Sequence, residues 1–213
     1  MVAVAVTYDV KKERRDLYAP KPGVFTRVDV PTMSFFMIDG HGDPNTSADY
    51  REAVEALYAV SYELRFWAKR QLGRVHTVGP LEGVWSANDP DVFRTRDKGA
   101  WDWTLMIVQP DWITSEMADA ALAELRAKKA LPGLQRVRFA PYDEGLSVQT
   151  MHIGSYDDEG PTLARLHDEY IPQNGLVMTG RHHEIYLSDP RRVEPARLRT
   201  ILRQPVAANG SRS

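Results

Sequence analysis

Apolar and polar positions follow one another along the chain in an order that occurs twice. An apolar run over residues 33–38 ends in a glycine-rich segment, 39–44, and apolar residues at helical spacing follow over about 49–72. Two short apolar runs, 81–87 and 101–108, then have the length and the flanking turn residues that are typical of strands. The pattern predicts a strand, a glycine loop, a helix and two strands.

The same order returns in the second half of the chain, with negligible sequence identity to the first half. There the pattern predicts a strand at 146–153, a loop at 154–157 and a helix at about 159–171. Short extended runs are expected at 176–179, 182–188 and 199–206. A further helix is expected over about 115–129, because Ser115 can cap its first turn and two lysines suit its last.

This repeat predicts an α+β fold of two strand-helix-strand-strand modules. Their antiparallel strands are expected to form one curved sheet with the helices on one face, and the opposite face of the sheet is expected to leave a ligand groove between the modules. The expected parts are an N-terminal arm (1–22), module one (about 23–140), module two (about 141–206) and a C-terminal tail (207–213). The arm is basic, and a solvated tail is favoured over a contact for an acidic partner.

The composition limits the function classes. The 213 residues carry 27 Lys and Arg against 29 Asp and Glu, a formal net charge of −2, so no overall attraction to nucleic acid or to an anionic membrane is expected. The sequence has no cysteine, which excludes a thiol nucleophile and a thiolate metal site. Its apolar N-terminal run is too short for a signal peptide or a membrane span. We expect a cytoplasmic monomer or homodimer with no direct nucleic-acid or membrane partner.

The segment 181–187 carries the first candidate chemistry. On a strand, His182, Glu184 and Tyr186 point to one face, and residues two apart lie about 7 Å from each other, near enough to hold one small molecule between them. Glu184 could then take a proton from water, and Tyr186 could donate a hydrogen bond to negative charge that develops on the ligand. A glutamate paired with an arginine on a solvated face is an equally good interpretation of the same residues.

Glu82 is the second candidate, because it occupies the place in the first module that Glu184 occupies in the second. Paired acids at one groove would suit acid–base catalysis or recognition of a cationic ligand, whereas an edge-strand salt bridge is the structural alternative. Aromatic residues cluster beside these acids and suit a planar, lipophilic ligand. The predicted ligand-binding residues are Phe36, Tyr58, Tyr62, Trp85, Trp103, Met106, His152, Tyr156 and His182. No metal and no cofactor are expected, because His182 and His183 diverge on a strand and no HExxH or phosphate-loop motif occurs.

Five segments together resemble the GyrI-like small-molecule-binding proteins, in the stand-alone bacterial branch. They are Asp39–Asn45, Ala56–Tyr62, Pro80–Trp85, Val148–Gly154 and His182–Pro190, and the resemblance extends from about Leu17 to Val206. It implies a duplicated fold with a groove at the pseudo-twofold. Relatives include drug-binding domains of transcription regulators and proteins that counter gyrase-directed toxins. Some stand-alone members hydrolyse the strained ring of spirocyclopropane-type DNA-alkylating agents without a cofactor.

The resemblance also implies roles for single residues. In the hydrolase branch a Glu and a Tyr act near the groove, together with aromatic walls. By the resemblance, the segment 182–187 supplies Glu184 and Tyr186 here, and the segment 81–85 supplies Glu82 and Trp85. Three functions are consistent with these expectations. The first is cofactor-free hydrolysis of a strained electrophile by water that Glu184 activates, with Glu82 positioning water or ligand; the second is sequestration of lipophilic or cationic drugs; the third is a gyrase-protecting interaction.

Overall fold

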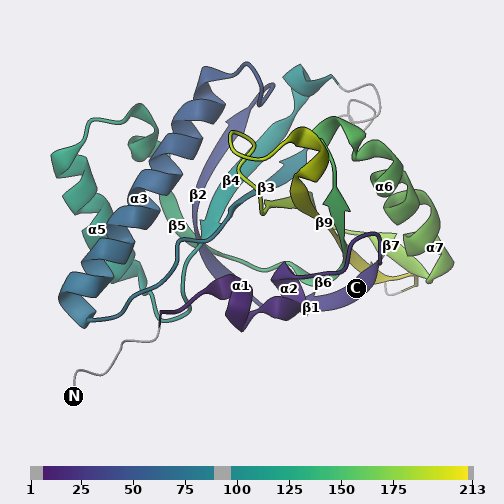
Figure 1. Cartoon of the computed structure of the whole chain (residues 1–213), viewed down its shortest axis with the longest axis horizontal. Helices are drawn as coiled ribbons and strands as arrows, with labels where there is room; N and C mark the ends of the chain where they lie inside the picture. The colour runs from purple at the N-terminus through teal and green to yellow at the C-terminus, as the bar shows by residue number, and fades with distance from the viewer. Residues whose placement is uncertain (1–6, 89–96, 211–213) are drawn as a thin grey trace. The chain divides into compact units, whose positions relative to one another are not determined.

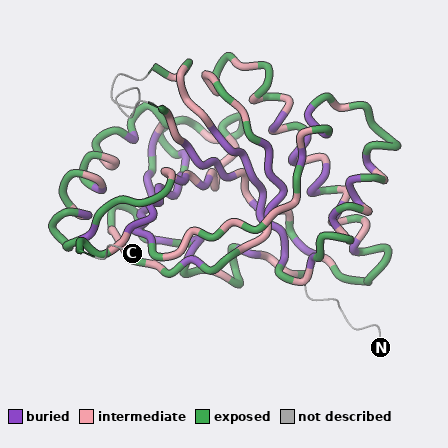
Figure 2. Tube along the Cα trace, turned by 180° about the vertical axis from the view of Figure 1, so that it is seen from behind, coloured by how far each residue is buried: buried purple, intermediate pink, exposed green. Residues whose placement is uncertain are grey.

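The computed structural model describes residues 7–88 and 97–210 (Figure 1). The chain divides into two compact units, which are described here one at a time. Unit one consists of Met33–Tyr142 and the segment that ends at Glu13, and unit two consists of Arg14–Thr32 and the chain from Asp143 onward. In both units the strands are mostly buried, whereas the helices are buried along one side only (Figure 2).

Unit one is an antiparallel sheet with two long helices, α3 and α5, that pack against each other (Figure 1). The strand order is β3-β4-β2-β5. The elements are α1 (Val10–Glu13), β2 (Met33–His41), α3 (Ala48–Leu72), β3 (Leu81–Ser86), η1 (Lys98–Ala100), β4 (Asp102–Val108), α5 (Ser115–Lys128), η2 (Pro132–Arg136) and β5 (Arg138–Tyr142). Helix α3 begins where the Ser47 side chain accepts a hydrogen bond from the Tyr50 N–H, and it ends at Gly73, which has the left-handed conformation that favours glycine.

The register of unit one decides which side chains face α3. Gly40 lies opposite Trp103, and Trp103 lies opposite Trp85, so these three residues share one face of the sheet. Tyr50 of α3 contacts both indoles, with ring centroids 6.4 Å from Trp85 and 5.3 Å from Trp103. A side chain at position 40 would overlap the Trp103 ring, so the close packing of this face requires glycine there.

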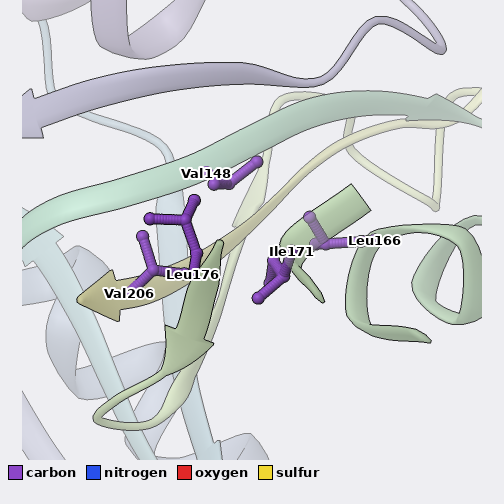
Figure 3. Packing of buried hydrophobic residues seen from close by; sticks show 5 residues of the cluster. All are labelled: Val148, Leu166, Ile171, Leu176 and Val206. Atoms are coloured by element: carbon purple, nitrogen blue, oxygen red, sulfur yellow. The ribbon is translucent and has the colours of Figure 1, made fainter. Parts of the chain in front are cut away.

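Unit two repeats this arrangement with a shorter helical segment. The strand order is β1-β6-β9-β8, and β7 pairs with the far end of β9. The elements are α2 (Arg15–Tyr18), β1 (Thr26–Val30), β6 (Gly145–Ile153), η3 (Tyr156–Asp158), α6 (Gly160–Ala164), the π-helical turn η4 (Arg165–Tyr170), α7 (Ile171–Gln173), β7 (Leu176–Met178), β8 (His182–Tyr186), η5 (Pro195–Arg197) and β9 (Arg199–Ala208). Val148, Val206 and Leu176 of the strands pack against Leu166 and Ile171 of the helical segment (Figure 3).

The predicted repeat is confirmed within each unit. In unit one the chain runs β2-α3-β3-β4 with the spatial order β3-β4-β2, and in unit two it runs from β6 through the helical segment to β8 and β9 with the order β8-β9-β6. The α+β class with antiparallel strands is therefore correct. The second helix differs from the prediction: it is not one regular helix over 159–171 but two short α-helices joined by η4.

The segment predicted as an N-terminal arm is folded from Val10 onward. Leu17 is fully buried and Tyr18 is 3 % exposed, so these two residues anchor α2, as the sequence allowed. The basic residues that frame them stay at or near the surface. The prediction of a solvated tail is thus correct for the charged side chains, whereas the backbone of residues 10–18 forms the short helices α1 and α2.

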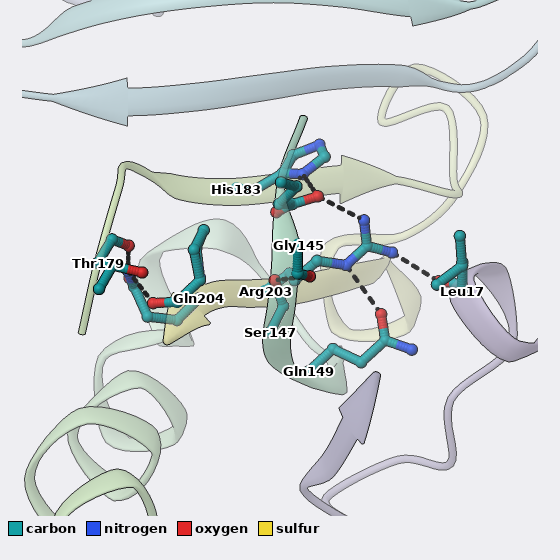
Figure 4. A network of polar contacts seen from close by, with 10 residues as sticks. Leu17, Gly145, Ser147, Gln149, Thr179, His183, Arg203 and Gln204 are labelled. Atoms are coloured by element: carbon teal, nitrogen blue, oxygen red, sulfur yellow. Dashed lines mark hydrogen bonds and ion pairs between the residues drawn. The ribbon is translucent and has the colours of Figure 1, made fainter. Parts of the chain in front are cut away.

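A buried polar network holds α2 to the sheet of unit two (Figure 4). The Arg203 guanidinium donates hydrogen bonds to Glu144 Oε2 at 3.0 Å, to Gln149 Oε1 at 2.9 Å and to the Leu17 carbonyl at 2.9 Å. His183 Nδ1 lies 3.0 Å from the other Glu144 oxygen. Burial raises the pKa of Glu144, but the charges of His183 and Arg203 outweigh it and lower that pKa to about 2.

Candidate functional site

Three of the predicted site residues form a row on β8. The alternation of the strand places His182, Glu184 and Tyr186 on one face, and in the register Glu184 lies opposite Leu202 of β9. The same face carries Val206, which packs against the helical segment of unit two. The row therefore lies on the face of the sheet that this segment covers, and not on the opposite face, where the sequence predicts the ligand groove.

The carboxylate and the phenol of this row contact each other directly. Tyr186 Oη donates a hydrogen bond to Glu184 Oε2 at 2.7 Å, and the Glu184 side chain is 16 % exposed. The Tyr156 ring packs edge-on against Tyr186 with centroids 5.6 Å apart, and Tyr156 is partly exposed at the start of η3. An acid held by a phenol, with one aromatic wall and access to solvent, can act as a base toward water or a ligand.

Two imidazoles continue the row beyond Glu184. His182 Nε2 lies 3.6 Å from Glu184 Oε1, and the His182 ring packs edge-on against His167 of η4 with centroids 5.7 Å apart. Burial, and then the neighbouring His182, lower the pKa of His167 to about 4, so this ring is neutral near pH 7. Sequence reasoning missed His167, because it stands among the apolar positions of the predicted helix and none of the motifs includes it.

His152 lies on the same face of unit two, on β6. Its ring nitrogens are each 3.3 Å from an oxygen, Nδ1 from the Thr162 hydroxyl and Nε2 from the Ser155 carbonyl. It lies opposite Thr200, which in turn lies opposite Tyr186, so two strand spacings of about 4.8 Å separate it from the phenol. The two contacts of His152 connect β6 to residues on both sides of η3, which contains Tyr156.

The predicted aromatic residues of unit one lie on its helix-covered face. Trp85 and Trp103 are 5 % and 1 % exposed and pack around Tyr50, and Phe36 is fully buried with its ring 5.5 Å from that of Phe139. On α3 itself, Tyr58 is half-buried and Tyr62 is 45 % exposed. Core packing accounts for the three buried rings, and their contact with a ligand stays a prediction.

Glu82 and Met106 lie on the other face of the unit-one sheet. Glu82 is 1 % exposed and lies directly opposite Met106, whereas Trp85, three residues along the same strand, points to the α3 side. One small ligand on either face cannot contact both Glu82 and Trp85. The equivalence of Glu82 with Glu184 and a meeting of the two acids at one groove stay predictions.

A family model that describes a GyrI-like small-molecule-binding domain matches residues 25–207. The chain belongs to the GyrI-like family. This match covers the whole β8 row as well as the aromatic face of unit one, and it establishes small-molecule binding as the general character of the domain.

Solved GyrI-like relatives cover nearly the whole chain. An uncharacterised conserved protein from Listeria innocua is 39 % identical, with a TM-score of 0.86 over 94 % of this chain and 100 % of its own. A protein described as a hydrolase from Listeria innocua is 37 % identical, with a TM-score of 0.82 over 94 % of this chain and 100 % of its own. The C-terminal domain of EcmrR, 12 % identical with a TM-score of 0.56 over 87 % of this chain and 98 % of its own, shares the fold. No curated protein sequence matches this GyrI-like chain.

Unit two of this GyrI-like chain also has a shallow hollow of about 330 Å³ beside α7 and β7. Apolar side chains of these two elements line it, and His167 and Asn209 are its polar residues. Of the row described above, only His167 reaches it. Within residues 7–88 and 97–210, no group of three or more His, Asp or Glu side chains has an arrangement that could hold a metal ion, and no helix has the length and hydropathy to cross a membrane.

Proposed function

We propose that this GyrI-like protein is a cofactor-independent hydrolase that adds water to strained, electrophilic small molecules of the cyclopropane-bearing class, with Glu184 as the general base. The observation that carries the proposal is the 2.7 Å hydrogen bond from Tyr186 Oη to Glu184 Oε2 in a partly exposed, aromatic setting. The relatives from Listeria innocua that are described as hydrolases, both 37 % identical, support it.

The proposed step uses the free side of the carboxylate. Glu184 takes one proton from a water molecule, the water oxygen forms a bond to a ring carbon, and the strained carbon–carbon bond breaks. The electron pair of that bond moves into the conjugated carbonyl of the substrate, which then takes the proton back from Glu184. Because the Tyr186 proton is donated to Glu184, the first role of this phenol is to orient the carboxylate rather than to bind the leaving group.

The test is to incubate the purified protein with a spirocyclopropane-bearing alkylating agent and to follow the hydrated product by mass spectrometry. The Glu184→Gln variant should lose between about 100-fold and 10,000-fold in turnover, the usual contribution of a general base. Glu194→Gln is the matched control, because Glu194 is exposed in the same unit. Wild-type turnover in Glu184→Gln would remove the mechanism.

The same incubation separates hydrolysis from sequestration. If the agent quenches the aromatic fluorescence of the protein and is then recovered intact, the protein binds the agent without hydrolysing it, and the hydrolase proposal fails. The role predicted for Glu82 in placing water or ligand is tested in parallel by Glu82→Gln, which should raise KM or lower kcat if this acid contacts the ligand.

A further inference from the structure

Three ring nitrogens of the two histidines in this row are buried and have no hydrogen-bond partner within residues 7–88 and 97–210. They are Nδ1 and Nε2 of His182 and Nε2 of His167. A buried polar atom that loses its water and gains no partner costs about 1–3 kcal/mol, so native proteins retain few of them. Two adjacent histidines that share this cost indicate a bond that forms in another state of the site.

The acceptor nearest to His182 that the contacts identify is the site carboxylate itself. His182 Nε2 is 3.6 Å from Glu184 Oε1, about 0.6 Å longer than an N–H···O hydrogen bond. The other carboxylate oxygen, Oε2, already accepts from Tyr186. Both side chains project from the same strand face two residues apart, so a small rotation of either one closes the gap. Hydrogen bonds of catalytic groups are often long in the free enzyme and tighten when the substrate binds.

We infer that His182 is a positioning residue for the hydrolysis proposed above. In the substrate complex its Nε2–H donates to Glu184 Oε1, so that Tyr186 and His182 hold the carboxylate from both oxygens. His167 sets the plane of the His182 ring through their edge-on contact at 5.7 Å. One lone pair of Oε1 remains for the water proton, and its direction is fixed by the two donors. This inference rests on the proposed hydrolase function.

The test compares four variants by steady-state kinetics with the spirocyclopropane-bearing agent. The amide nitrogen of glutamine can take the place of Nε2, whereas that of asparagine is too short to reach Oε1. His182→Gln should therefore keep kcat within about 3-fold of the wild type, and His182→Asn and His182→Phe should each lose at least about 10-fold in kcat with little change in KM. His41→Phe, at an exposed histidine of unit one, is the control and should behave like the wild type.

Circular dichroism confirms that each variant folds, and the Gln–Asn pair keeps the test valid if the Phe variant does not. A wild-type protein that turns over the agent while His182→Asn and His182→Gln have the same kcat would overturn the positioning role and leave the hydrolase intact. A loss confined to KM would do the same, because it would make His182 a ligand contact only. A wild-type protein without turnover overturns the hydrolase proposal, and the inference falls with it.

Discussion

Replacement of Arg203 by methionine should be among the most destabilising single substitutions in unit two. Arg203 is 2 % exposed, and its guanidinium makes three hydrogen bonds, to Glu144, Gln149 and the Leu17 carbonyl (Figure 4). Methionine fills a similar volume but leaves the Glu144 carboxylate buried with His183 as its remaining partner in the network. Breaking a buried ion pair by removing one member typically costs about 3–5 kcal/mol, and we expect that loss in the free energy of unfolding at pH 7.

The pH dependence distinguishes this cause from a simple packing defect. The pKa of Glu144 is about 2 in the folded protein and near 4.5 when unfolded, so its contribution to stability is present above pH 4.5 and is lost as the pH falls toward 2. The shift corresponds to about 3 kcal/mol at 1.36 kcal/mol per pKa unit. His183 and Arg203 both lower this pKa, so the part of the contribution that comes from Arg203 is absent in Arg203→Met, and the stability difference between wild type and variant should narrow as the pH falls below about 4.5.

Urea denaturation followed by circular dichroism at a series of pH values measures both quantities. Arg27→Met is the matched control, because Arg27 is exposed and its guanidinium bonds Asn174 at the surface of the same unit; it should cost less than about 1 kcal/mol. An Arg203→Met variant within 1 kcal/mol of the wild type at pH 7 would refute the reasoning. So would a stability difference that widens as the pH is lowered.

Three further substitutions test other parts of the structure. Burial lowers the pKa of His76 from 6.5 to about 4, so the free energy of unfolding should fall by about 3 kcal/mol as the pH is lowered from 6.5 to 4. His76→Phe should remove this pH dependence in urea titrations, and an unchanged pH dependence would contradict the prediction. Gly40→Ala should lower Tm in a thermal melt by several degrees, because the added methyl overlaps an indole ring, whereas Gly160→Ala, which meets no atom within 4 Å, should not. Tyr186→Phe should lower kcat for the spirocyclopropane agent about 10-fold, through loss of its bond to Glu184, and wild-type kcat would show that the phenol is dispensable.

Hydrophobic patterning was sufficient to predict the repeated order of elements, because the inner strands are short runs rich in apolar residues and a helix that buries one side repeats its apolar residues at a fixed spacing. The strands β1 and β5 were not predicted. They are five residues each and mostly exposed or half-buried, and β5 contains Pro141, so they lack the apolar runs that mark the inner strands. Their place in the sheet depends on pairing with β6 and β2, a tertiary interaction that a local pattern does not contain.

Strand alternation alone placed His182, Glu184 and Tyr186 on one face, and the structure agrees, because a period of two leaves no freedom once the segment is a strand. The same rule applied to β3 separates Glu82 from Trp85. The equivalence of Glu82 with Glu184 came from matching acids between motifs, whereas strand parity, which is readable in the sequence, shows that Glu82 and Trp85 cannot share a face of β3. His167 was not found in this way, because it lies on the helical segment rather than on the strand and belongs to none of the motifs.

The groups around the Glu184 carboxylate have a common origin. Tyr186 and His182 come from its own strand, and His167 comes from the helical segment that covers the same face of unit two. Residues two apart on one strand keep their spacing through the backbone, so the orientation of this carboxylate does not depend on long loops. Substitutions within the row should therefore change kcat, whereas residues that contact only the ligand should change KM. This division would separate the catalytic from the binding residues of the protein by kinetics alone.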